Sequence, residues 1–486
     1  MNKEKTKQDQ LDSTHAPTVS LEAGGSEAYE LDSTQTRKLL RKLDLTFNPV
    51  FMLVYLTCFL DRSNIGNVKV AGIIPDIHTT TASFSTAVSI FYATYILIEV
   101  PTTLIMKLVT PRILLSGLCI VWSLTTLFTG LIQGVAGLYV ARLVLGLCEG
   151  GLMPCLNLYL SMVYNRNELG TRTAYLFSCA ALSGAFGGLL AYGLLQMDGV
   201  SGFAGWRWVF IIEGLMSIVI VPVIWFGLPS NPSNAWFLND TEKEMMRVRD
   251  AQRAEYMGNG SFDWKEVKMA FRDPKVYLSG MIQFCQDILL YGFSTFLPSI
   301  LTSMGYNKLE ANYLTIPVYI WGAIIFVAVA HISDKYQVRG AAIFLTNTLG
   351  IAGYILLLTV QTGGVRYFAT FLCVSAVYVG PGLNLAWLNA NTAPHYKRAA
   401  AIGIQQSIGN SAGIVSGQIY RTAPYVLGNS MSLGALGVAE ILIAGMVLYL
   451  RKENRAKEET LMGLGSEVVR PEGRVGDEAL DFKYHL

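Results

Sequence analysis

Charged residues are scarce in this chain. Asp, Glu, Lys and Arg together make up 15% of the 486 residues, and the net charge is only +2. An average soluble domain carries roughly 25% charged residues, so an ordinary water-soluble globule is excluded. The near-neutral balance also gives no basis for nucleic-acid binding, which needs a strongly basic surface.

Reactive and metal-binding residue patterns are also scarce. The chain has five histidines, and its seven cysteines fall in or beside apolar runs without any C-x-x-C spacing. We find no P-loop and no H-E-x-x-H. We therefore interpret the cysteines as packing residues, and we expect no metal, no cofactor and no catalytic residue.

Apolar runs of about 20 residues recur from residue 47 to residue 450, and about 20 residues is the length that a helix needs to cross a bilayer. They predict an all-α membrane protein with twelve transmembrane helices in two halves of six. The predicted spans are 48–68, 84–107, 112–132, 136–162, 172–196, 206–228, 276–303, 311–332, 340–361, 366–388, 396–420 and 431–450.

Five segments follow from this pattern. We expect an N-terminal tail (1–46), a first six-helix half (47–228), a linker (229–275), a second six-helix half (276–451) and a C-terminal tail (452–486). The linker alternates acids and bases, which is typical of a solvated amphipathic connection. The C-terminal tail is polar enough to be predicted disordered.

Lys and Arg near the span ends predict the orientation, because basic residues accumulate on the cytoplasmic side. One side carries Arg37, Lys38, Arg41, Lys42, Lys107, Arg112, Arg166, Arg172, Lys335, Arg339, Lys397, Arg398, Arg451, Lys452, Arg455 and Lys457. The other side carries only Lys69, Arg207, Lys308, Arg366 and Arg421. Both termini and the linker are thus predicted to be cytoplasmic.

Ionisable residues inside the spans are candidate functional residues, because a charge facing lipid is costly. Asp61 and Arg62 lie in the first span, and Arg142 and Glu149 lie in the fourth. The latter two are seven residues apart, two helical turns, and so share one face. The alternative is that Asp61 with Arg62, and Arg142 with Glu149, form structural ion pairs.

This set of residues suits proton-coupled transport of an anion. An arginine stays charged and offers a planar fork of donors to a carboxylate, whereas a carboxylic acid can take up and release a proton. We therefore predict that Arg62 and Arg142 bind substrate and that Asp61 and Glu149 couple protons. Further candidate substrate-binding residues are Tyr92, Gln283, Tyr291 and Asn410, although polar side chains in spans also serve as interhelical hydrogen-bond partners.

Three stretches resemble a known family. They are Asp61-Arg62-Ser63-Asn64-Ile65-Gly66-Asn67, then residues 142–150 with the sequence RLVLGLCEG, and residues 205–214 with the sequence GWRWVFIIEG. All three are similar to the anion:cation symporter family of the major facilitator superfamily, in its fungal allantoate permease-like branch. The resemblance implies a major facilitator fold and small organic anions as substrates. It also implies that Arg62 binds the substrate carboxylate while Asp61 and Glu149 exchange protons.

A loop after the second helix of the second half also resembles a superfamily motif, of the form D-[RK]-x-x-x-R. It places Asp334, Lys335 and Arg339 as a latch at the cytoplasmic ends of helices. The corresponding loop of the first half, 107–112, keeps bases but lacks the acid. Here the sequence departs from the motif.

The expected function is secondary active transport of a small organic anion by proton symport with alternating access. The expected partners are the anion, protons and the lipid bilayer, with no nucleic acid, and we expect a monomer in the plasma membrane. The main alternative is an exporter of a secondary metabolite or drug by proton antiport. A non-transporting nutrient receptor is a further alternative.

Overall fold

The structure is a computed structural model that describes residues 33–164, 166–257, 264–464, 476–480 and 482–486. Within these residues the regular elements are helices. Their bounds are α1 (Ser33–Ala71), α2 (Ile73–Asp76), α3 (Thr81–Leu108), α4 (Pro111–Thr129), α5 (Val135–Glu149), α6 (Leu152–Val163), α7 (Arg166–Leu194), α8 (Gly205–Gly227), α9 (Asp240–Met257), α10 (Trp264–Arg272), α11 (Pro274–Ser303), α12 (Lys308–Tyr336), α13 (Arg339–Thr359), α14 (Gly363–Val377), α15 (Val379–Ala390), α16 (His395–Asn410), α17 (Ala412–Ile419) and α18 (Val426–Leu464).

The predicted all-α membrane fold is confirmed. Eleven helical stretches in the described part of the chain are long and apolar enough to cross a membrane. The predicted span 396–420 is the remaining one, and it consists of two helices, α16 and α17, interrupted at Ser411. Span 136–162 is likewise divided into α5 and α6, at Gly150 and Gly151.

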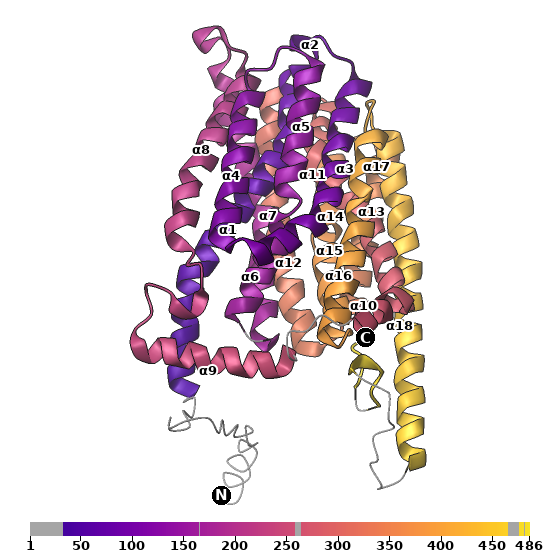
Figure 1. Ribbon diagram of the computed structural model, residues 1–486. Coiled ribbons are helices and arrows are strands. Elements are labelled where there is room, and N and C mark those ends of the chain that lie inside the picture. Colours follow the sequence, from indigo (N-terminus) through magenta and orange to yellow (C-terminus); the bar gives the residue numbers. More distant parts are fainter. Residues whose placement is uncertain (1–32, 165, 258–263, 465–475, 481) are drawn as a thin grey trace, which may run out of the picture.

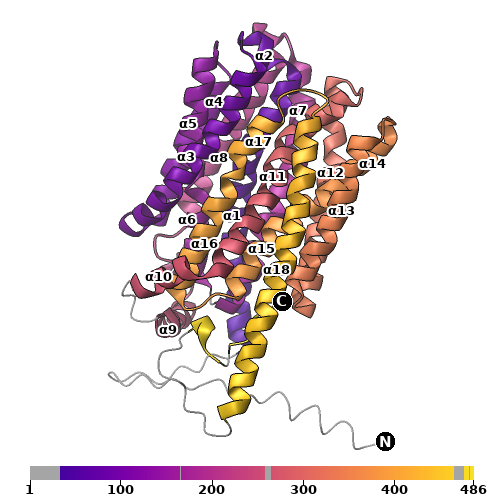
Figure 2. The same ribbon diagram turned by 90° about the vertical axis from the view of Figure 1, so that its right-hand side faces the viewer.

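The long helices run side by side, with the linker helices α9 and α10 at one end and the short helix α2 at the other (Figure 1). We call these two ends the α9 side and the α2 side. Residues 476–480 and 482–486 lie on the α9 side, below the second half of the chain (Figure 2). The helices α1 to α8 form one half, and α11 to α18 form the other.

Local sequence signals set several helix ends. Asp273 caps α11 by accepting a hydrogen bond from the Lys275 backbone N–H, and Pro274 occupies the first helical position, where its missing N–H costs nothing. At α12, Asn307 and Glu310 form a reciprocal capping box. At the start of both helices, these caps satisfy backbone N–H groups that would otherwise be unpaired.

Two predictions about the polar segments are wrong. Helices α1 and α18 extend beyond the predicted spans, because α1 begins at Ser33 and α18 continues to Leu464. The linker is not wholly solvated, because Arg249 is 2% exposed and forms an ion pair with Glu168 of α7. The C-terminal tail is not disordered over residues 476–480 and 482–486, which pack against the second half.

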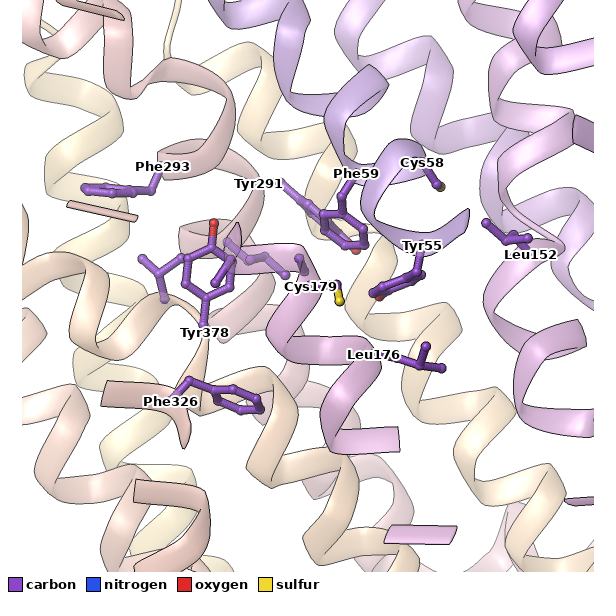
Figure 3. Packing of buried hydrophobic residues seen from close by; sticks show 14 of the residues in the cluster. Tyr55, Cys58, Phe59, Leu152, Leu176, Cys179, Tyr291, Phe293, Phe326 and Tyr378 are labelled. Carbon is purple, nitrogen blue, oxygen red and sulfur yellow. The ribbon is translucent and has the colours of Figure 1, made fainter. Parts of the chain in front are cut away.

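A continuous buried core joins the two halves. Figure 3 shows part of it, where Tyr55, Cys58 and Phe59 of α1 lie near Leu176 and Cys179 of α7. The rings of Tyr55 and Phe59 are 4.8 Å apart. Aromatic pairs of this kind add to the burial of apolar surface, so this region holds α1 in place beside the polar residues described next.

The halves also contact each other closely on the α2 side. A Cβ atom added at Gly66 of α1 would lie 1.6 Å from the carbonyl oxygen of Thr295 in α11. Lys69 donates a hydrogen bond to the Tyr420 carbonyl, and Ser89 donates one to the Ile414 carbonyl, both across the halves. The path between the halves is therefore shut on this side.

Candidate functional site

Arg62 and Glu149 form a buried ion pair between α1 and α5. The Arg62 Nη2 atom lies 3.3 Å from Glu149 Oε2, with 7% and 0% of the two side chains exposed. Cys58, one helical turn before Arg62, directs its Sγ to the same carboxylate oxygen at 3.3 Å. The ion pair thus joins the two spans that the sequence predicts to line one site, but the partners differ from the predicted structural pairs.

Aromatic rings surround the Arg62 guanidinium. Its Cζ lies 4.6 Å from the Phe59 ring centroid, 4.7 Å from that of Tyr95 and 5.3 Å from that of Phe91. Such rings attract a cation through their π faces and exclude water from it. They hold the positive charge at a fixed point in the core. Phe59 and Phe91 are functional candidates that the sequence did not single out, because aromatic residues are common throughout the spans.

Arg142 lies beside this pair. It lines a small cavity together with Arg62, Ile65, Val88, Phe91, Tyr92 and Thr295. The Nε and Nη2 atoms of Arg142 are buried and have no hydrogen-bond partner within the described residues. Buried polar groups are normally paired, so these two donors are available to an anion that enters the cavity.

The cavity is too small for substrate in this conformation. Its volume is about 10 Å³, room for roughly one water molecule. Pockets that bind small organic molecules have volumes of about 300–1,000 Å³. Helices or side chains must therefore move before an organic anion can reach both arginines.

Asp61 lies on a different side of α1 from Arg62. Its Oδ2 atom accepts a hydrogen bond from Thr126 of α4 at 3.3 Å, whereas Oδ1 is buried and has no partner within the described residues. Glu213 of α8 is also fully buried, and neither of its carboxyl oxygens has a hydrogen-bond partner in that part of the chain. Asp61 is thus buried, and its hydrogen bond is to α4 and not to the Arg62 and Glu149 pair.

A chain of polar contacts connects Tyr92 to the second half. The rings of Tyr92 and Tyr291 are 4.5 Å apart, and the Tyr291 hydroxyl donates to Asn410 Oδ1 at 2.6 Å. Asn410 Nδ2 in turn donates to Glu99 Oε2 at 3.3 Å, returning to the first half. Tyr92, Tyr291 and Asn410 therefore lie at the interface of the halves, adjacent to the arginine cavity.

Gln283 belongs to a separate network inside the second half. It donates to Asp287 Oδ1 at 3.1 Å and accepts from Asn384 Nδ2 at 2.9 Å. Asn384 also pairs with Ser279, which accepts from Gln405. These contacts satisfy Gln283 and tie α11 to α15 and α16, so its present partners are those of a helix-joining residue.

The predicted loop latch is partly assembled. Arg339 forms an ion pair with Asp334 at 3.3 Å and donates a hydrogen bond to the Ala386 carbonyl of α15. Lys335 is placed over the ring of Tyr336, 5.5 Å from its centroid. The ion pair of Asp334 and Arg339 thus connects the end of α12 to the start of α13, and Arg339 also connects α13 to α15. Lys335 takes part in neither contact.

Residues 409–413 read Gly-Asn-Ser-Ala-Gly, which matches the G-x-S-x-G pattern found around hydrolase nucleophiles. The surroundings do not fit that role. The Ser411 hydroxyl donates to the Ile408 carbonyl at 2.6 Å, and a Cβ at Gly413 would lie 2.2 Å from the Tyr92 ring. Here the glycines allow α16 and α17 to approach neighbouring side chains.

Comparison with known proteins agrees with this architecture. The family model described as Major Facilitator Superfamily matches residues 51–417. The chain belongs to the major facilitator superfamily. It is therefore a membrane transporter and not an enzyme, and the superfamily part of the predicted resemblance is confirmed.

Fungal transporters are among the relatives of this chain. An uncharacterized transporter of Schizosaccharomyces pombe is 49% identical over 95% of this chain and 92% of its own length. The high-affinity nicotinic acid transporter of Saccharomyces cerevisiae is 35% identical over 92% of this chain and 84% of its own length. Among solved structures, a bacterial homolog of the human lysosomal transporter Spinster, inward-facing and occupied, has a TM-score of 0.64 at 17% identity, covering 88% of this chain and 98% of that one.

Proposed function

We propose that this major facilitator protein carries a small organic anion together with protons, in the manner of the anion:cation symporters. The observation that carries the proposal is the buried Arg62–Glu149 ion pair beside Arg142, whose Nε and Nη2 donors have no partner among the described residues. The relative named for nicotinic acid supports a carboxylate as substrate, because nicotinic acid is an aromatic carboxylic acid.

The coupling follows from charge balance. In the empty site, Glu149 neutralises Arg62. A substrate carboxylate that takes the place of Glu149 at Arg62 leaves the Glu149 carboxylate with an unpaired negative charge, and an unpaired buried charge costs several kcal/mol. A proton on Glu149 removes it. Substrate and proton together leave the net charge of the site unchanged, so each favours the binding of the other.

The unpaired oxygen of the Glu149 carboxylate, Oε1, is the atom to which the proton can bind. Glu149 Oε1 is buried and has no hydrogen-bond partner in the described part of the chain, while Oε2 is held by Arg62 and Cys58. We assign Glu149 as the primary proton-coupling residue and Asp61 as a second one. Arg62 and Arg142 bind the carboxylate. Tyr92 of α3 lies beside them and contacts Tyr291 of the second half, which is hydrogen-bonded to Asn410.

The orientation belongs to the proposal as well. The excess of Lys and Arg at the α9 side predicts that both termini and the linker face the cytoplasm. A short epitope tag inserted at residue 260 should bind antibody only after cells are permeabilised. Staining of intact cells expressing the tagged protein would contradict this orientation.

An uptake screen tests the function. Cells that express the protein are given labelled organic anions, beginning with nicotinate, with and without a protonophore. We expect uptake of at least one carboxylate that collapses when the proton gradient is dissipated. Uptake that is insensitive to the protonophore would contradict symport, and gradient-driven loss of preloaded anion would favour the antiport alternative. Arg421 lies on the α2 side, away from the site, so Arg421→Lys should keep uptake. It is the matched control for Lys substitutions at Arg62 and Arg142.

A further inference from the structure

The described C-terminal residues, 476–480 and 482–486, fill a socket on the α9 side of the second half. Asp477 is 0% exposed. Its carboxylate accepts hydrogen bonds from Lys397 of α16 at 2.8 and 3.0 Å, and another from Lys275 of α11. Asp273 lies 2.8 Å from Lys397 and 3.3 Å from Lys275. Two lysines thus meet two aspartates, one of which comes from the tail.

Backbone groups of the segment also form hydrogen bonds, with side chains of α18. Lys457 of α18 donates to the carbonyls of Asp477 and Phe482. Asn454 of α18 exchanges two hydrogen bonds, both 2.9 Å long, with the Tyr484 backbone. The Tyr484 ring lies 4.2 Å from the Lys275 Nζ and 4.1 Å from the Lys457 Nζ, and its hydroxyl donates to the Asp477 carbonyl.

The last residues reach the end of α15. Trp387 Nε1 and Asn391 Nδ2 both donate to the His485 carbonyl, at 2.9 and 2.8 Å, and the His485 N–H donates to Asn391 Oδ1 at 2.8 Å. At the other end of the segment, Gly476 has a φ of +70°, and a Cβ there would lie 2.6 Å from the Ala393 carbonyl carbon. Glycine is therefore required where the segment enters the socket.

The socket residues surround one structural unit, the hairpin of α15 and α16. The segment binds the end of α15 through Trp387 and Asn391, and the start of α16 through Lys397. It binds the neighbouring helices α11 and α18 with Lys275 and Lys457. The C-terminal segment, which is part of neither the hairpin nor these helices, thereby fixes the hairpin to α11 and α18.

This hairpin is placed to move. Its two helices are separated from α14 and α17 by interruptions at Tyr378 and Ser411. The hairpin also contacts the first half, α15 against α7 and α16 against α3. Opening and closing on the α9 side must change those contacts, because the halves are held together on the α2 side.

We propose that residues 476–486 act as a releasable clamp that restrains the α15–α16 hairpin and holds back closure of the α9 side. The clamp is an acidic peptide bound in cis to the Lys275 and Lys397 socket. Its release lets the hairpin bend toward the first half. A modification or a partner that displaces the segment would thus alter the conformational cycle without touching the arginine site.

Spin-label distances test the clamp in the full-length protein. The native cysteines are buried, so labels can be placed on Ala399→Cys of α16 with Lys452→Cys of α18, and on Ala399→Cys with Met162→Cys of α6. We expect a narrow Ala399–Lys452 distribution. In Asp477→Asn, and in a chain ending at residue 475, this distribution should broaden, and the Ala399–Met162 pair should gain a shorter component.

Two controls separate the clamp from general effects. Glu478 is half exposed and 3.8 Å from Lys397, so Glu478→Gln removes a neighbouring charge and should leave both distributions unchanged. A reference pair in the first half, Val140→Cys with Val219→Cys, should stay constant in every variant. A peptide with the sequence of residues 476–486, added to the shortened chain, should restore the narrow distribution, and the same peptide with Asp477→Asn should not.

Three results would overturn the proposal. The first is an Ala399–Lys452 distribution in the shortened chain that equals that of the full-length protein. The second is equal broadening by Glu478→Gln, which would indicate a non-specific charge effect. The third is loss of the Val140–Val219 distance together with the hairpin distance, which would make the segment a general stabiliser of the fold.

Discussion

Arg62 Nη2 and Glu149 Oε2 lie 3.3 Å apart in the buried centre of the first half. The two residues come from α1 and α5 and are separated by 87 positions in the sequence. Each is the other's charged partner, so any anion that binds Arg62 competes with Glu149. This competition makes the occupancy of the site depend on protons. One variant of Glu149 and one variant of Arg62 test it.

Glu149→Gln should uncouple substrate from protons. The amide is neutral at every pH and resembles the protonated acid, so Arg62 is left free to bind a carboxylate. We expect proton-driven accumulation of labelled nicotinate in proteoliposomes to fall by about tenfold or more, a free-energy change of about 1.4 kcal/mol or greater. Exchange of nicotinate between the two sides should persist. Glu440→Gln, in α18 and bonded to Thr348, serves as the control that keeps accumulation.

Full proton-driven accumulation in Glu149→Gln would remove Glu149 from the coupling role. Asp61, the other buried carboxylate of the proposal, would then be tested by Asp61→Asn in the same assay.

Arg62→Lys should weaken binding while keeping the charge. Lysine cannot present the planar fork that binds both oxygens of a carboxylate, and it loses the fit to the Phe59 and Tyr95 rings. A hydrogen bond to a charged group contributes about 1.5–3 kcal/mol, so the apparent affinity should drop by about tenfold to a hundredfold. The concentration dependence of uptake measures it, at equal surface expression. An unchanged half-saturating concentration would show that Arg62 does not bind the substrate.

The spans and the fold follow from the sequence because lipid imposes a simple requirement. A run of about 20 apolar residues is expected to become a helix, since a helix satisfies all backbone hydrogen bonds within a single segment in hydrocarbon. Arg142 and Glu149 were placed on one face by spacing alone. The actual partner of Glu149 is Arg62, from another helix. Packing between helices determines which helices face each other and which residues meet along their length. Residue spacing within a single helix does not contain this information.

The order of the C-terminal clamp could not be predicted from its own sequence. Its sequence is polar and lacks periodicity, so composition predicts disorder. Its order comes from groups on other elements, such as Lys397 and Asn391, which look like ordinary loop residues in the sequence. Cys58 is a similar case, since its position one turn from Arg62 was visible but its contact with Glu149 depends on α5.

Gly66→Ala should open the α2 side. The added methyl group would lie 1.6 Å from the Thr295 carbonyl oxygen, far inside any permitted contact, so α1 and α11 must separate. We expect a longer distance between spin labels on Thr80→Cys and Leu427→Cys, and loss of most uptake because the α2 side no longer shuts. Gly117→Ala in α4 meets nothing within 4 Å and should leave both unchanged. Wild-type distance and uptake in Gly66→Ala would contradict the close approach.

Acidification should loosen the clamp through His485. Burial and the positive charge of Arg339 lower the pKa of His485 below its ordinary value of 6.5, so the docked segment favours the neutral ring. A group whose pKa is lowered by docking contributes its full stabilisation above its ordinary pKa and loses it as the pH falls. The Ala399–Lys452 distribution should therefore be narrow at about pH 7.5 and broaden below about pH 6.5, because the released histidine takes up a proton more readily. His485→Gln cannot titrate, and its distribution should change less over the same pH range. Equal broadening in His485→Gln and in the native chain would assign the pH response to another group, and no broadening in either would show that docking is independent of the histidine charge.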